Sequence, residues 1–232
     1  ANLRRLPEDF AGACGVIAKP YSDQGVKTAL AYLETLGWTG PDCWYAHGIH
    51  FNSDELRRLA ETGTGVAHCP VSNMKLSSGV CKVPEMMQLG VPVGLAVDGS
   101  ASNDCSNLMA EIRSAYLLHR LTWSDKAPSG YDILKIATKG SAAILGRDDI
   151  GSLEVGKAAD LFAIDTSSLE FVCAENDVAN LLGTVGVSKP ARFVYVNGVL
   201  VSHDGILIGI DEENVAYEAR RRVNGMLRKA GM

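Results

Sequence analysis

The 232-residue sequence predicts an α/β fold followed by a smaller part built mostly of strands. Short apolar strands alternate with amphipathic helices through residue 148, which is the pattern of a parallel sheet covered by helices. Residues 91–97 form an unbroken apolar run, and strands of that kind are buried on both faces. Beyond residue 148 strand and hairpin signals predominate. We therefore expect two domains, residues 1–148 and residues 149–232.

The elements expected before residue 98 follow local signals. Gly37 ends a helix whose apolar residues recur at helical spacing. The pair Asn52 and Glu55 has capping-box spacing at the start of a helix that Gly63 closes. The expected order is helix 23–36, strand 43–46, helix 52–62, strand 65–69, helix 83–89 and strand 91–97.

After Asp98 the pattern changes. Ser106 is a suitable N-cap for a helix reaching His119, and Ser129 starts a helical stretch that breaks near Gly140 and ends at Gly146. Asn-Gly between two apolar runs is the strongest hairpin signal, and Asn197-Gly198 has that setting. The remaining expected elements are strands 159–164, 193–196 and 199–201, and a charged helix over residues 212–229.

Composition narrows the class of protein. A hydrophobic fraction of 47% with 21% charged residues is ordinary for a globular protein. The net charge of −5 and the lack of a basic stripe argue against a nucleic-acid partner. The sequence has no membrane-length apolar run and no secretion signal, and its six cysteines lack C-x-x-C spacing. We expect free thiols and a cytoplasmic protein.

Asp98 is the first candidate for chemistry. It follows the apolar strand at residues 91–97, and parallel α/β folds place their chemistry at the carboxyl ends of strands. The alternative is that Asp98-Gly99 forms a hairpin turn. A hairpin needs a second strand at once, whereas residues 100–104 are polar and suit a loop that enters a helix. The functional interpretation is therefore favoured.

The five histidines are not equally good candidates for a catalytic or metal-binding role. His47 ends the strand at residues 43–46, whereas His50 lies three residues further and would face the opposite side of an extended strand. The two should not share a metal, and His47 is the better candidate. His68 also closes a strand, although Cys69-Pro70 can be a simple strand end. His119 and His203 are interpreted as structural or exposed.

By themselves, His47 and Asp98 suggest a hydrolytic centre. A histidine can orient or deprotonate water, and a carboxylate can bind a divalent metal or accept a proton.

Several stretches of the sequence, in order, resemble the aminohydrolase and chlorohydrolase branch of the amidohydrolase superfamily. The matching stretches are AHG at 46–48, GTGVAHCPVSN at 63–73, LSSG at 76–79, VGLAVDG at 93–99, GSLEVGKAADL at 151–161 and VNG at 196–198. The match runs from about residue 29 to the end. Within the branch, DGSASND at 98–104 most resembles the 8-oxoguanine deaminases and their hydroxytriazine-hydrolase relatives.

The resemblance implies the C-terminal part of a (β/α)8 TIM-type barrel, followed by a segment of a small β-sandwich domain. It implies that Asp98 ends the eighth strand as a metal ligand and proton acceptor. His47 would end the sixth strand and orient the water and substrate. His68 and Asn73, in the motif after the seventh strand, would shape the substrate pocket.

The sequence departs from the family pattern before His47. The first-strand His-x-His is absent, and the window expected to hold the fifth-strand His-x-x-Glu reads RLPEDFAG at residues 5–12. A βαβ unit takes about 30 residues, so seven units need about 210, whereas 97 residues precede Asp98. We therefore expect the C-terminal half of a deaminase, with three metal ligands and the proton-shuttling glutamate missing.

The expected activity is metal-dependent deamination of an oxidised purine such as 8-oxoguanine, with release of ammonia. One divalent metal is expected, zinc first and iron as the alternative. Expected partners are a small heterocyclic substrate and either further copies of the chain or the missing N-terminal half, with no nucleic acid and no membrane. Two alternatives remain: a triazine-type chlorohydrolase or alkylaminohydrolase, and a non-catalytic partial barrel that serves as a binding module.

Overall fold

The computed structural model describes residues 28–232, which divide into two compact units. The first unit contains residues 28–157 and Ser167–Val187, and the second contains Ala158–Thr166 and Ser188–Met232. Residues 149–157 and Ser167–Val187, expected in the second domain, thus lie in the first unit. The reason is packing within that unit: the Asn180 side chain accepts a hydrogen bond from the Tyr131 N–H, and Gly183 lies against Tyr116.

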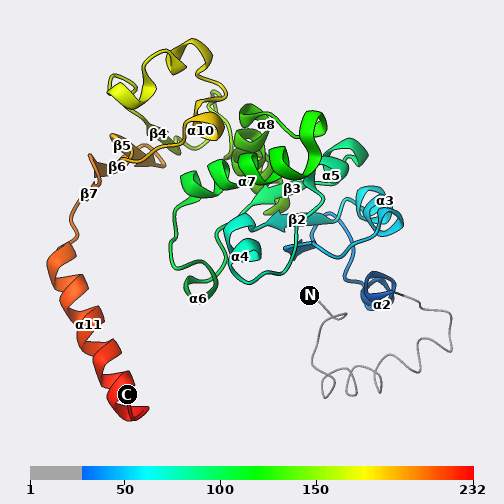
Figure 1. Ribbon diagram of the computed structural model, residues 1–232, viewed down its shortest axis with the longest axis horizontal. Helices are drawn as coiled ribbons and strands as arrows, with labels where there is room; N and C mark the ends of the chain where they lie inside the picture. Colours follow the sequence, from blue (N-terminus) through cyan, green and yellow to red (C-terminus); the bar gives the residue numbers. More distant parts are fainter. Residues whose placement is uncertain (1–27) are drawn as a thin grey trace. The chain divides into compact units, whose positions relative to one another are not determined.

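A three-stranded parallel sheet forms the centre of the first unit (Figure 1). The strands β1, β2 and β3 lie in that order, with Ala46 paired to Ala67 and His68 paired to Leu95. Helices connect them, as the alternating pattern predicts. The bounds are α2 Ala29–Thr35, β1 Trp44–Ala46, α3 Ser53–Thr62, β2 Gly65–His68, α4 Pro70–Lys75, α5 Val83–Leu89 and β3 Val93–Leu95.

Two expected helices of this part are confirmed at their caps. The Asn52 side chain accepts hydrogen bonds from the backbone of Asp54 and Glu55, and the Glu55 carboxylate accepts one from the Asn52 N–H, so the capping box is complete. Gly63 and Gly90 end α3 and α5 in left-handed conformations. Of the expected helix 23–36, residues before 28 lie outside the described part.

The rest of the first unit is helical. Asn107, one residue after the expected Ser106, caps α7 with its side chain. The elements are α6 Ser100–Asn103, α7 Leu108–Trp123, a 3-10 turn at Ser124–Lys126, α8 Gly130–Lys135, a π-helical segment at Ile136–Gly140, α9 Ser141–Ile144, 3-10 turns at Leu169–Phe171 and Ala174–Asp177, and α10 Leu181–Thr184.

The expected helix break near Gly140 is wrong, because the chain continues through the π-helical segment into α9. Gly140 lies so close to β3 that an added Cβ would stand 2.1 Å from the Val93 carbonyl oxygen. The next residue, Ser141, accepts a hydrogen bond from the Leu95 N–H at 3.1 Å and donates one to the Leu95 carbonyl at 3.2 Å. These two hydrogen bonds fix the position of β3, the strand that precedes Asp98.

The second unit contains a four-stranded antiparallel sheet in the order β4-β5-β6-β7. The predicted hairpin is confirmed: Asn197 and Gly198 join β5 to β6 with φ of 49° and 77°, the left-handed values of a type I′ turn. Asp211 caps α11, which has the expected bounds. The elements are β4 Leu161–Ala163, β5 Phe193–Val196, β6 Val199–His203, β7 Ile206–Leu207 and α11 Glu212–Lys229.

Over residues 28–232, every helix is too short or too polar to cross a lipid bilayer.

Candidate active site

The carboxyl ends of β1 and β3 carry the two leading candidates. His47 directly follows β1, and Asp98 comes three residues after β3. Both have left-handed backbones, with φ of 68° at His47 and 64° at Asp98. Non-glycine residues adopt this conformation at a cost, and such positions cluster at functional sites. The left-handed turn at each strand end lets both side chains point into the same space.

His47 and Asp98 lie together, as expected from their places at strand ends. The His47 Nε2 is 3.7 Å from the Asp98 Oδ2, and about a third of each side chain is exposed. The pair is therefore half-buried and open to solvent on one side.

Helix α4, which the sequence did not predict, holds both members of this pair. The Ser72 hydroxyl donates to Asp98 Oδ2 at 2.6 Å, and the His47 Nδ1 lies 2.8 Å from Asn73 Oδ1. Ser72 and Asn73 are buried at 0% and 2% exposure. Ser102 in α6 adds a second hydroxyl to Asp98 Oδ2 at 2.8 Å. Adjacent residues of one buried helical turn thus fix two side chains from different strands.

The surroundings of Asp98 favour its ionised form. Hydrogen bonds from Ser72 and Ser102 lower the pKa of the Asp98 carboxyl below its ordinary value, with smaller contributions from the Gly99 backbone and from His47. Burial acts in the opposite direction but is the weaker effect. Asp98 is therefore a carboxylate at neutral pH, able to accept a proton or bind a cation.

His68 lies deeper than the pair. It is 1% exposed, and its ring centroid is 5.2 Å from that of the fully buried His119. Within the described part of the chain, no group hydrogen-bonds to either ring nitrogen of His68 or of His119. Burial lowers the pKa of His68 well below its ordinary value and lowers that of His119 to about 4, so both rings are neutral.

A buried carboxyl group supports the loop after β3. Asn103 donates through Nδ2 to the Val97 carbonyl at 2.5 Å and to Glu111 Oε1 at 2.7 Å. The second Glu111 oxygen accepts from the Val71 N–H at 3.1 Å, at the start of α4. Burial raises the pKa of Glu111. Glu111 therefore joins the loop that carries Asp98 to the helix that carries Ser72.

Of the four residues singled out from the sequence, the structure brings three into direct contact. These are His47 and its two neighbours Asn73 and Asp98, whereas His68 is buried and hydrogen-bonds to none of them. The parts played by Ser72 and Ser102 were missed. Both lie inside the recognised motifs, but a hydroxyl carries no spacing signal that tells a carboxylate partner from a helix cap. The catalytic, metal-binding and substrate-binding roles of His47, His68, Asn73 and Asp98 stay predictions.

The expected metal can be tested against the donors present. A zinc site uses three or more protein ligands. Among residues 28–232 no group of three or more His, Cys, Asp or Glu side chains is placed to hold an ion. Asp98 and His47 together offer too few donors. The described residues alone do not fit a catalytic zinc ion.

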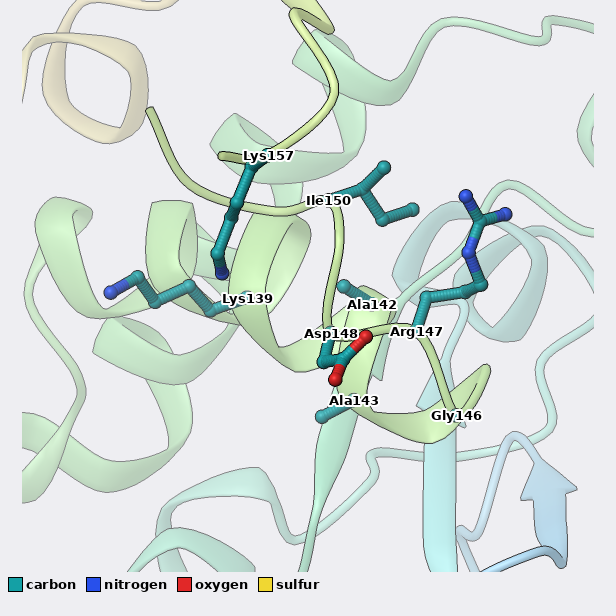
Figure 2. A pocket seen from close by; sticks show the side chains of 8 residues that line it. All are labelled: Lys139, Ala142, Ala143, Gly146, Arg147, Asp148, Ile150 and Lys157. Atoms are coloured by element: carbon teal, nitrogen blue, oxygen red, sulfur yellow. The ribbon is translucent and has the colours of Figure 1, made fainter. Parts of the chain in front are cut away.

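The first unit also has a surface pocket (Figure 2). It is formed around α9 and the segment that follows, and its lining includes Lys139, Arg147, Asp148 and Lys157. Two of these cations are paired, Lys139 with Glu154 at 3.4 Å and Arg147 with Asp149 at 2.6 Å. None of the sequence-predicted site residues lines this pocket.

Comparison with curated proteins finds close relatives. The chain is 46% identical over 187 residues to 8-oxoguanine deaminase of Pseudomonas aeruginosa, covering 81% of this chain and 41% of that protein. It is 43% identical over 204 residues to hydroxydechloroatrazine ethylaminohydrolase of Pseudomonas sp. strain ADP, covering 87% of this chain and 42% of that protein. The chain thus spans about two fifths of the length of these relatives.

Solved structures give the same result. An adenosine deaminase from Xanthomonas campestris with bound zinc matches with a TM-score of 0.79 and 32% identity, over 86% of this chain and 46% of that one. Atrazine chlorohydrolase from Arthrobacter aurescens, complexed with zinc, matches with a TM-score of 0.82 and 31% identity, over 89% of this chain and 45% of that one. A sequence model of the amidohydrolase family matches residues 19–201. The chain therefore belongs to the amidohydrolase family.

Proposed function

We propose that this chain supplies the C-terminal strands and part of the active site of a metal-dependent aminohydrolase. The observation that carries the proposal is the pairing of His47 with Asp98 at the ends of parallel strands, held by Ser72 and Asn73. In this proposal β1, β2 and β3 are the sixth, seventh and eighth strands of a (β/α)8 barrel, and the antiparallel sheet is one part of a β-sandwich.

Hydrolytic deamination adds the oxygen of water to a ring carbon and releases the amine on that carbon as ammonia. The water must lose a proton, and the leaving nitrogen must gain one. The Asp98 carboxylate, kept ionised by two hydroxyl donors, is suited to accept the proton from water. His47, whose Nε2 lies 3.7 Å from Asp98, is placed to orient that water by hydrogen bonding.

The metal of the complete site would use Asp98 as one ligand, with zinc as the first expectation and iron as the alternative. Zinc is present in the related adenosine deaminase and atrazine chlorohydrolase structures. Because the described residues lack a sufficient donor set, the other ligands have to come from elsewhere. The sources we propose are the N-terminal half of the barrel or another chain.

An oxidised purine such as 8-oxoguanine is the proposed substrate. The 46% identity to 8-oxoguanine deaminase supports it. The second candidate is removal of an alkylamine or chloride from a triazine, which the 43% identity to hydroxydechloroatrazine ethylaminohydrolase favours to a similar degree. The two reactions share attack by water on an electron-poor ring carbon and differ in the leaving group.

A pair of chimeras tests the proposal. The N-terminal part of each Pseudomonas relative, up to the matched region, is joined to this chain, and the products are assayed with zinc. We expect ammonia release from 8-oxoguanine by the deaminase chimera, and amine release from the triazine by the other. If the substrate follows the N-terminal part, both halves form one site, and the selectivity lies outside this chain.

The 232-residue chain alone is the control, and we expect it to release no ammonia with zinc present. Turnover by the chain alone that Asp98→Ala abolishes would show that its own residues complete the site. Two folded, zinc-loaded chimeras without any turnover would contradict the proposed function and favour the non-catalytic binding module.

A further inference from the structure

The environment of Asn73 defines a specific task for this residue. Its Oδ1 lies 2.8 Å from His47 Nδ1, and the residue is 2% exposed. With the amide oxygen facing the ring, as the structure has it, the His47 Nδ1 is the donor of this hydrogen bond. The contact therefore selects one of the two neutral forms of the His47 ring.

The backbone of Asn73 is held by hydrogen bonds on both sides. The Asn73 N–H donates to the Cys69 carbonyl at 3.0 Å, and the Asn73 carbonyl accepts from the Ser78 N–H at 2.9 Å. The preceding residue, Ser72, holds Asp98. The same helical turn therefore sets the orientation of the histidine and of its carboxylate partner.

We propose that Asn73 is a positioning residue that holds neutral His47 as the Nδ1–H tautomer, with the Nε2 lone pair facing the space beside Asp98. This rests on the proposed function, since it gives His47 its role there. In this tautomer Nε2 can accept a hydrogen bond from water in that space, which orients the water for the proposed proton transfer to Asp98. This role is distinct from the substrate contact expected for Asn73 from the resemblance.

Nitrogen-15 NMR of histidine-labelled 232-residue chain tests the tautomer without any assay of activity. The His47 signals are assigned by their loss in His47→Gln. We expect the Nδ1 signal at the shift of a protonated ring nitrogen and the Nε2 signal at that of an unprotonated one, in the neutral form. Neutral His47 with its proton on Nε2 would overturn the proposal.

Two variants isolate the amide oxygen. Asn73→Leu keeps the approximate volume but removes the acceptor, so we expect the proton to shift towards Nε2. Asn73→Asp keeps an acceptor and should keep the Nδ1–H form. Met74→Ala, at the neighbouring and 45% exposed position, is the matched control and should change nothing. A tautomer that stays unchanged in Asn73→Leu would contradict the proposal.

The active chimera supplies a second readout. We expect Asn73→Leu to lower kcat about 10- to 100-fold with little change in KM, and Asn73→Asp to recover part of the loss. A change confined to KM would indicate substrate contact instead and overturn the positioning role. The two proposals can fail separately: an inactive chimera with the Nδ1–H tautomer contradicts only the reaction, whereas an active chimera with the Nε2–H tautomer contradicts only the role of Asn73.

Discussion

The two units use their sheets in different ways. In the first unit every residue of β2 and β3 is buried, and His47, which follows β1, meets Asp98 beyond the end of β3. In the second unit no residue of β4, β5 or β7 is buried, and Ser202 alone is buried in β6. Helix α11 has no buried residue. The second unit has regular secondary structure, yet the buried apolar core lies almost wholly in the first.

This difference shows what a candidate site requires of its surroundings. Buried strands have fixed ends, so the loops that follow them can hold side chains at defined distances. An exposed antiparallel sheet can be specified by its turns alone, but it offers no such fixed edge. The following predictions test the contrast, starting with the largest effect.

Removing the carboxylate of the first unit should remove the chemistry. We expect Asp98→Asn in the active chimera to lower kcat by about 10²- to 10⁴-fold, the range attributed to a positioned acid or base. Asp104→Asn is the control in the same loop, since Asp104 pairs with the exposed Lys75 and should affect only that surface pair. In the second unit, His203→Gln should leave kcat unchanged. Equal losses for Asp98 and Asp104 would indicate a general effect on the loop.

Truncating a side chain should destabilise the first unit, which has a buried core, much more than the second. Leu56 in α3 is fully buried, and we expect Leu56→Ala to lower the free energy of unfolding by about 2–5 kcal/mol. Val199 in β6 is 64% exposed, and Val199→Ala should cost less than about 0.5 kcal/mol. Tryptophan fluorescence in urea measures the first cost, because all three tryptophans lie in the first unit, and far-ultraviolet circular dichroism in urea measures the second. Similar losses in the free energy of unfolding at positions 56 and 199 would contradict the difference in burial between the two units.

Acid should weaken the first unit through its buried histidines. Below pH 6.5 the unfolded chain takes up a proton on His119, whereas the folded chain does so only near pH 4. As the pH falls from 6.5 to 4, the protonation of His119 therefore lowers the free energy of unfolding by up to about 3 kcal/mol. Below pH 4 His119 is protonated in both states, and its contribution no longer changes with pH. The raised pKa of Glu111 acts in the opposite direction.

The contribution of His119 is isolated by His119→Gln, measured in urea across that pH range. The variant should show a shallower loss of stability than the wild type. Parallel curves would mean that the His119 ring is protonated equally in the folded and unfolded states.

Two glycines should show the smallest effects, with opposite signs. Gly198 has a φ of 77° in the hairpin, where an alanine is strained, so Gly198→Ala should destabilise the hairpin by about 1 kcal/mol. Gly225 lies within α11 with open space around it, so Gly225→Ala should stabilise that helix by about 0.5–1 kcal/mol. Amide hydrogen exchange at Val199 and in α11 measures each effect. Slower exchange at Val199 in Gly198→Ala would contradict the turn assignment.

Local signals explain which elements were predictable. The bounds of α5 and α11 were predicted to the residue, and α3 began directly after its predicted capping residue, because caps and glycines act within one turn. The Asn197-Gly198 hairpin followed from the same kind of signal. The π-helical segment could not be predicted, because it depends on the contact of Gly140 with Val93, which lies 47 residues away in the chain.

The sequence predicted the positions of His47 and Asp98, but not the residues that hydrogen-bond to them. Strand periodicity placed His47 and Asp98 at strand ends, and the resemblance gave them roles. Helix α4 was missed, because Pro70 was interpreted only as the end of a strand, whereas it also begins a helix of six residues. Without that helix, the contacts of Ser72 with Asp98 and of Asn73 with His47 could not be foreseen.

The left-handed backbone at His47 and Asp98 has a consequence for directed evolution. Glycine adopts such a conformation without the steric cost that histidine and aspartate bear. A library selected for heat resistance alone should therefore drift towards glycine at positions 47 and 98, while Val66 and Val93 persist because they fill the core. Only a selection that also demands turnover would retain histidine and aspartate there, so the residues recovered under the two regimes would separate what the fold prefers from what the reaction requires.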